Sequence, residues 1–173
     1  MTYRARQFWN ALQARPDLRG VEEARRFLPA SLMALFLQMQ PGEQAHSIQV
    51  FQALREQGIS HPDLLTAALL HDVGKIRYPL QHWERALIVV CKKLLPKQVI
   101  NWGSGEPAGW RRPFVVAEQH PAWGAALVAD AGAPNQVVSL IARHQQKPNR
   151  EPWQDIKIED QLLSLLQVLD DQY

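Results

Sequence analysis

Apolar residues recur every three or four positions along most of the chain, and this spacing places them on one face of an α-helix. No segment alternates apolar and polar residues over the length of a strand. The pattern therefore predicts an all-α fold. The expected helical segments are, in chain order, 2–14, 21–40, 41–58, 60–74, 79–95, 114–131, 134–144 and 159–171.

Proline and glycine set the expected ends of these segments. Pro29 predicts a bend within the second segment, because proline cannot donate the helical hydrogen bond. Gly58 and Gly74 each follow a helical run, and glycine readily adopts the left-handed conformation that ends a helix. The pair His120-Pro121 predicts a break within the sixth segment.

Two neighbouring regions carry further structural expectations. Residues 96–113 are rich in Gly, Pro and Trp, so we expect a long irregular loop there, and loops of that length in compact domains are commonly functional. The helix before this loop is expected to bury a single stripe of side chains. That stripe consists of Leu80, Trp83, Leu87, Cys91 and Leu94.

The 173 residues are enough to bury a core within one compact domain. We expect residues 1–40 to form N-terminal helices packed on a main domain of residues 41–173. The single cysteine, Cys91, cannot form an internal disulfide, which is typical of a reducing compartment and predicts a cytoplasmic protein. No apolar run approaches the ~20 residues that span a membrane. A formal net charge of +2 is too small to indicate a nucleic-acid partner.

Several ionisable side chains fall on faces that the helical spacing buries. Asp170, for example, continues the apolar stripe of Leu163 and Leu166. Burying such a group without a partner costs ~1–3 kcal/mol, and more if it is charged, so we expect these residues to meet one another. The set consists of His46, His71, Asp72, His120, His144 and Asp170.

Imidazole and carboxylate groups together are the ligands of first-row divalent metals. A cluster around such an ion would offset the burial cost that each group has alone. Any one of these histidines taken singly is more typical of a hydrogen-bonded core residue, so the metal hypothesis depends on the whole set. The expected cofactor is one or two divalent ions of Fe, Mn, Co, Ni or Zn, with Mg as a further possibility.

The order of these residues resembles a known family. His46, the doublet His71-Asp72 and the distal Asp170 follow the order H…HD…D on successive helices, as in the HD superfamily of metal-dependent phosphohydrolases. The stretch "LLHDVGK" is very close to that family's apolar-apolar-H-D-x-G-K pattern. The resemblance covers about residues 44–171 and implies a multi-helix HD-domain bundle.

Two-metal members of that superfamily add two histidines from intervening helices, and "EQHPAWGAALV" and "LIARHQQKP" resemble these elements. The resemblance thus implies a first ion held by His46, His71, Asp72 and Asp170, and a second held by Asp72, His120 and His144. "HPAWG" also resembles the HD-GYP phosphodiesterases of cyclic di-GMP. However, Gln145 stands where that branch has a second histidine, and "KPNREPW" lacks the Gly-Tyr-Pro element, so cyclic di-GMP is not the expected substrate.

The resemblance implies an enzyme that hydrolyses a phosphoester or phosphoanhydride of a small phosphorylated substrate, such as a nucleotide, with a metal-activated hydroxide. Asp72 and Lys75 are the expected catalytic residues. Lys75, Arg111 and Arg112 are expected to contact substrate phosphate, although the two arginines fit a solvated surface equally well. Two alternatives stay open: a non-catalytic HD module that uses a structural metal and binds a partner, and an HD-fold di-iron oxygenase.

Overall fold

The structure, a computed structural model, describes residues 16–146 and 158–172, and every regular element within these ranges is a helix. This confirms the expected all-α fold. The expected helix at 2–14 and the "KPNREPW" stretch lie outside the described residues. None of the described helices is both long enough and apolar enough to cross a membrane.

The described α-helices are α2 (Leu18–Phe27), α3 (Ala30–Phe36), α4 (Pro41–Glu56), α5 (Pro62–Leu70), α6 (His82–Leu94), α7 (Pro96–Trp102), α8 (Arg112–Asp130), α9 (Asn135–Arg143) and α10 (Ile158–Gln172). Two short 3₁₀ helices, η1 (Val73–Arg77) and η2 (Gly109–Arg111), precede α6 and α8.

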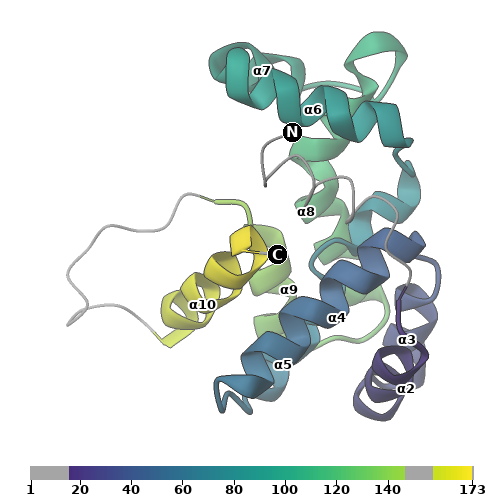
Figure 1. The fold of residues 1–173 in the computed structure, drawn as a ribbon, viewed down its shortest axis with the longest axis vertical. Helices are drawn as coiled ribbons and strands as arrows, with labels where there is room; N and C mark the ends of the chain where they lie inside the picture. The colour runs from purple at the N-terminus through teal and green to yellow at the C-terminus, as the bar shows by residue number, and fades with distance from the viewer. Residues whose placement is uncertain (1–15, 147–157, 173) are drawn as a thin grey trace.

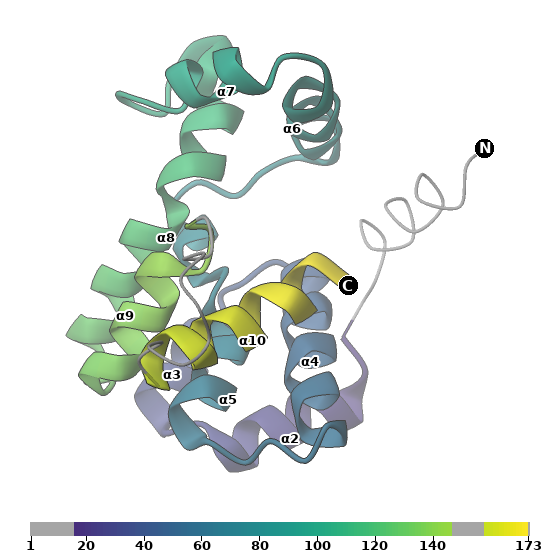
Figure 2. The same ribbon diagram turned by 90° about the vertical axis from the view of Figure 1, so that its left-hand side faces the viewer.

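The long helix α8 joins two packed parts of the molecule (Figures 1 and 2). Around one end of α8 lie α2–α5, α9 and α10, whose buried side chains form the larger hydrophobic core. Around the other end lie α6 and α7. These two helices and α8 enclose a smaller core, which consists of Leu80, Ile88, Val99, Phe114, Val116 and Ala117.

The segment expected at 21–40 consists of two helices rather than one bent helix. Leu28 and Pro29 both have extended backbone, with ψ of 138° and 153°, so the chain breaks fully between α2 and α3. Both helices contribute buried residues, including Ala24 and Phe36, to the larger core. The expected end at Gly58 is confirmed, since its φ is +79°.

The expectation that Gly74 ends a helix by a left-handed turn is wrong. The helix α5 ends at Leu70, and Gly74 lies inside η1, with a φ outside the left-handed region. A Cβ atom on Gly74 would lie 2.0 Å from the carbonyl oxygen of His120. Glycine is needed there because η1 and α8 approach each other too closely for any side chain.

The expected break at His120-Pro121 is also wrong, because α8 runs without interruption through Pro121. Helix α8 contacts α3, α6, α7, α9 and η1 along its length. These tertiary contacts outweigh the one helical hydrogen bond that proline removes.

The region 96–113 is not the irregular loop that the sequence predicts, because it contains α7 and η2. Trp102 anchors this region: its ring centroid lies 5.1 Å from that of Phe114 and 5.3 Å from that of Trp110. Val99, on α7, is buried in the smaller core. Helices this short owe their stability to such packing rather than to local periodicity, which is why the pattern missed them.

The expected buried stripe of α6 is wrong in part. Trp83 and Leu94 are 60% and 68% exposed, whereas Glu84 and Ile88 are buried. Glu84 is buried because its carboxylate accepts a hydrogen bond from the Arg112 guanidinium of α8. A carboxylate counts as a surface residue in a hydropathy pattern. The pattern therefore could not predict that the face of α6 with Glu84 is buried.

Candidate metal centre

The ionisable residues that the sequence singled out lie on, or directly beside, six different elements. His46 lies on α4 and Asp170 on α10, while His71 and His144 directly follow α5 and α9. Asp72 precedes η1, and His120 lies within α8. The structure brings the six side chains together in two groups, within each of which the potential ligand atoms all lie within 4.8 Å of one another. The groups are His46, His71 and Asp170, and Asp72, His120 and His144.

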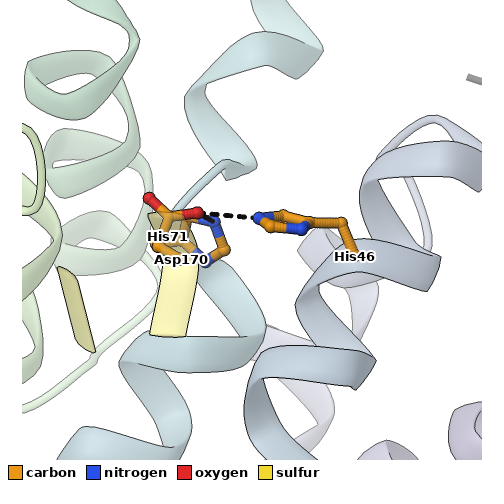
Figure 3. Close-up of side chains that lie close together, drawn as sticks. All are labelled: His46, His71 and Asp170. Carbon is orange, nitrogen blue, oxygen red and sulfur yellow. Dashed lines mark hydrogen bonds and ion pairs between the residues drawn. The ribbon is translucent and has the colours of Figure 1, made fainter. Parts of the chain in front are cut away.

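In the first group the Asp170 carboxylate lies against both imidazoles. Its Oδ1 atom lies 2.7 Å from Nε2 of His46 and 3.2 Å from Nε2 of His71. Figure 3 shows the His46 ring and the Asp170 carboxylate pointing toward each other, one from α4 and the other from α10. The consecutive helices α4 and α5 and the distant helix α10 therefore converge on one point.

In the second group Oδ1 of Asp72 lies 3.2 Å from Nε2 of His120. The His144 ring contacts the His120 ring at a centroid distance of 5.2 Å and the His71 ring at 5.3 Å. Asp72 also faces the first group, since its Oδ2 atom lies 3.8 Å from Nε2 of His71. The two groups therefore adjoin, and Asp72 lies between them.

Backbone hydrogen bonds fix the orientation of three of these rings. The Nδ1 atoms of His71, His120 and His144 lie 2.9, 3.0 and 2.8 Å from carbonyl oxygens of Ala68, Val116 and Ile141. A carbonyl oxygen only accepts, so Nδ1 must donate and therefore carries a proton. When such a ring is neutral it presents the lone pair of Nε2, and this arrangement is usual for histidines that bind metals.

One of these Nε2 atoms has no partner among the described residues. That of His144 is buried and makes no hydrogen bond within the described part of the chain. That of His71 makes no hydrogen bond of normal geometry there either, but it lies 3.2 Å from Oδ1 of Asp170. A buried nitrogen left unsatisfied costs ~1–3 kcal/mol, and a metal ion would remove that cost. Two carboxylates and four imidazoles are also a donor set that suits one or two divalent transition metals. The residues therefore fit a metal site.

The protonation states of the groups also suit metal binding. Burial opposes ionisation of Asp72 and Asp170, but neighbouring cationic groups, chiefly Lys75 for Asp72 and His71 for Asp170, hold the pKa of each carboxyl below its usual range. Burial, followed by repulsion from His71 and His120, lowers the pKa of His144 to about 3. Ionised carboxylates and neutral imidazoles are the forms that bind metals.

His71 differs from the other buried histidines. Burial opposes its protonated form, but the carboxylates of Asp170 and Asp72 outweigh burial and raise its pKa to about 9. In the absence of a metal ion, His71 therefore carries a positive charge at neutral pH. A metal ion that binds Nε2 of His71 has to displace this proton.

The two groups border a pocket of about 330 Å³. His46, Asp72, His120 and Asp170 line it, whereas His71 and His144 do not. Lys75 lines it as well, with its Nζ atom 2.6 Å from Oδ2 of Asp72. Burial opposes the charge on Lys75, but Asp72 and then Glu43 raise its pKa above the usual value. The pocket thus has potential metal ligands and an ammonium group in its wall.

The structure places Arg111 and Arg112 outside the lining of this pocket. Arg111 donates to the carbonyl oxygen of Asn101, at 3.0 Å. Arg112 is engaged with Glu84 and with the carbonyl oxygen of Pro79, the latter at 2.9 Å. These contacts give both arginines a structural role, and their contact with substrate stays a prediction.

The sequence interpretation missed two cations that do line the pocket, Arg85 and Lys92 of α6. They are seven residues apart, which places them on one face of the helix. The spacing of the two residues is visible in the sequence. The sequence does not show that this face points into the pocket, because its direction depends on how α6 packs against α4 and α8.

Comparisons with known proteins identify one family. Residues 44–171, most of the chain, match the family described as HD domain. Comparison with curated proteins and comparison with solved structures gave no match.

Proposed function

Since the chain belongs to the HD-domain family, we propose that it is a metal-dependent phosphohydrolase that cleaves a phosphoester or phosphoanhydride of a small substrate, with nucleotides as the expected class. The observation that carries the proposal is the pair of adjoining ligand groups, which contain an unsatisfied buried imidazole nitrogen, that of His144, and border a pocket.

The proposed ligands follow the two groups, with Asp72 shared between them. His46, His71 and Asp170 would hold one ion. His120 and His144 would hold the other ion, and Asp72 would hold both. Divalent ions at such a site supply Lewis acidity toward a phosphoryl oxygen and lower the pKa of bound water. The chain itself supplies the rigid positions of the ligands, because three of the imidazoles are held by carbonyl groups of their own helices.

Lys75 is proposed to act on both the carboxylate and the substrate. Its ammonium group fixes the orientation of Asp72 through the 2.6 Å contact. Because Lys75 also borders the pocket, it offers donors to a phosphate oxygen and compensates part of the negative charge of the substrate. Its position on η1, held against α8 at Gly74, keeps this charge close to the ligand groups.

The position of the ligands beside a pocket favours this proposal over the alternative of a purely structural metal. Structural metal sites are closed, whereas catalytic sites keep an open position for substrate or water. Four of the six proposed ligands border the pocket. The ligand set alone also suits a di-iron oxygenase, so the test has to distinguish the two reactions.

The test combines metal analysis with a substrate screen. The purified protein is loaded with Mn²⁺ or Fe²⁺ and assayed for phosphate release from p-nitrophenyl phosphate and nucleoside mono-, di- and triphosphates. Asp170→Asn should reduce turnover by more than the ~10–100-fold typical of changes in residues that only support ligands. Asp171→Asn is the matched control, because Asp171 is adjacent and exposed. Absence of both bound metal and phosphate release would contradict the proposal, and oxygen consumption without phosphate release would favour an oxygenase.

A further inference from the structure

One face of α6 borders the pocket together with the proposed metal ligands. Its four pocket residues, Arg85, Ile88, Val89 and Lys92, are spaced i, i+3, i+4 and i+7 and therefore form a single stripe. We call these four residues the α6 stripe. Two cations stand at its ends, and two aliphatic side chains lie between them. Over seven residues the helix rises by roughly 10 Å, about the length of a small organic phosphate.

Arg85 is held in place by residues at the start of α4. Its Nη2 atom donates to Oε1 of Glu43 at 2.7 Å and also contacts the side chain of Gln40. Glu43 is only 2% exposed, and its other oxygen accepts the backbone N–H of Gln40 at 3.1 Å. The guanidinium therefore has a fixed position, and Glu43 is the residue that positions it.

Part of the hydrogen-bonding capacity of Arg85 is unused. The guanidinium has five N–H donors, and Nε is buried without a partner in the described residues. A charged donor left unsatisfied at the edge of a pocket is costly, and an anion is the partner that best removes the cost. Arginine also matches the geometry of phosphate oxygens better than lysine does.

Lys92 differs from Arg85 in its surroundings. It is exposed at the edge of the pocket, and no ion pair holds it within the residues that the structure describes. A cation in this position attracts an incoming anion over a distance without fixing its orientation. Between the two cations, Ile88 and Val89 offer an aliphatic surface to the uncharged part of a ligand.

We propose that the α6 stripe recognises the substrate, with Arg85 bound to its phosphate group, Ile88 and Val89 packed on its organic part, and Lys92 attracting it to the pocket. This inference rests on the proposed function, since the phosphate that Arg85 binds is the one to be cleaved. A volume of about 330 Å³ lies at the lower end of the range for small-molecule sites. The pocket therefore suits a phosphate ester of which the bound part is about the size of a mononucleotide.

The first test measures binding of inorganic phosphate to the full-length protein as purified, by isothermal titration calorimetry. Arg85→Gln should weaken phosphate binding on the order of 10- to 100-fold, which is the effect of losing a charge-assisted hydrogen bond. The KM of the best substrate from the screen should rise by a similar factor, with a smaller change in kcat. Glu84→Gln is the comparison, because Glu84 is buried and also anchors α6, through its ion pair with Arg112, but does not line the pocket.

Arg85→Gln leaves the Glu43 carboxylate buried without its partner, which can prevent folding. In that case the double variant Glu43→Gln/Arg85→Gln removes the uncompensated charge and replaces the single variant in the same measurements. Unchanged phosphate affinity and KM in the folded variant would overturn the proposal. An equal loss in Glu84→Gln would overturn it too, because the effect would then come from the placement of α6.

The second test compares two adjacent lysines of α6. Lys92→Gln should weaken phosphate binding about two- to fivefold at low salt, and the difference should disappear near 1 M salt, where charges are screened beyond about 3 Å. Lys93→Gln removes the same charge from an exposed residue that does not line the pocket and should have no such effect. Equal effects of the two variants would contradict a specific role for Lys92.

The outcomes separate this inference from the proposed function. A protein that hydrolyses phosphoesters, but whose KM and phosphate affinity do not respond to Arg85→Gln, leaves the hydrolase proposal standing and overturns the α6 stripe. A protein without metal and without hydrolysis that still binds phosphate through Arg85 overturns the hydrolase proposal and supports the stripe as an anion site.

Discussion

Replacing Gly74 by alanine tests how the second ligand group is built. A Cβ atom at this position would lie 2.0 Å from the carbonyl oxygen of His120 and 2.6 Å from the backbone nitrogen of Gly124. Both contacts are with backbone, so no change of rotamer relieves them. Ordinary van der Waals contact begins at 3.4 Å, and η1 and α8 would therefore have to separate by about 1.4 Å.

That displacement would act directly on the proposed second metal site. Asp72 lies at the start of η1, and its Oδ1 atom is 3.2 Å from Nε2 of His120 on α8. Lengthening this distance by 1.4 Å gives about 4.6 Å, which is beyond hydrogen-bonding range. The first group contains no residue of α8. We expect Gly74→Ala to lose the second ion and keep the first, with stability lowered by ~1–3 kcal/mol through overpacking.

Metal content per chain and thermal unfolding measure the two effects together. Gly132→Ala is the matched control, because Gly132 lies just beyond α8, has a φ of +85° and would have no atom within 4 Å of a new Cβ. Its left-handed backbone makes the alanine cost roughly 1–2 kcal/mol, yet both ions should remain. If Gly74→Ala binds two ions with wild-type affinity, the close approach of η1 and α8 does not position the site as argued.

Three further predictions concern metal binding and turnover. Binding of the first ion at pH 7.5 should release about one proton, because the pKa of His71 is about 9 without metal. The apparent affinity for this ion should rise about tenfold per pH unit up to about pH 9. Calorimetry in buffers of different ionisation enthalpy measures the number of protons released, and absence of proton release would contradict the prediction. Lys75→Ala should lower turnover by more than it lowers metal content, because Lys75 is proposed to contact the substrate as well as Asp72. A loss of turnover that matches the loss of bound metal would instead show that Lys75 acts only by orienting Asp72. Removing the ions with a chelator should lower the melting temperature, since ligands present at about 100 times their Kd stabilise the folded state by about 2.7 kcal/mol; an unchanged melting temperature would mean that the ligand groups do not hold a metal.

The sequence predicted the candidate ligands because they have a local signature. An ionisable residue such as Asp170 on an apolar helical stripe is visible without a structure, and the family pattern around His71 and Asp72 adds a further constraint. The structure brings these predicted residues together. Whether they bind metal stays a prediction.

The features that the sequence did not predict depend on contacts between distant segments. The ion pairs Glu43–Arg85 and Glu84–Arg112 join residues that are 42 and 28 positions apart, and no local pattern indicates which charges will meet. They decide which face of α6 is buried and which face lines the pocket. For the same reason, the tertiary contacts of α8 kept it helical through Pro121, where local propensity alone predicted a break.

The most direct test of the central claim is the number of metal ions bound per chain after loading with Mn²⁺ and removal of free ion. We expect two ions in the wild-type protein and one in His144→Gln, because His144 belongs only to the second ligand group. A wild-type protein that retains no ion would contradict the account, and so would a His144→Gln variant that retains two.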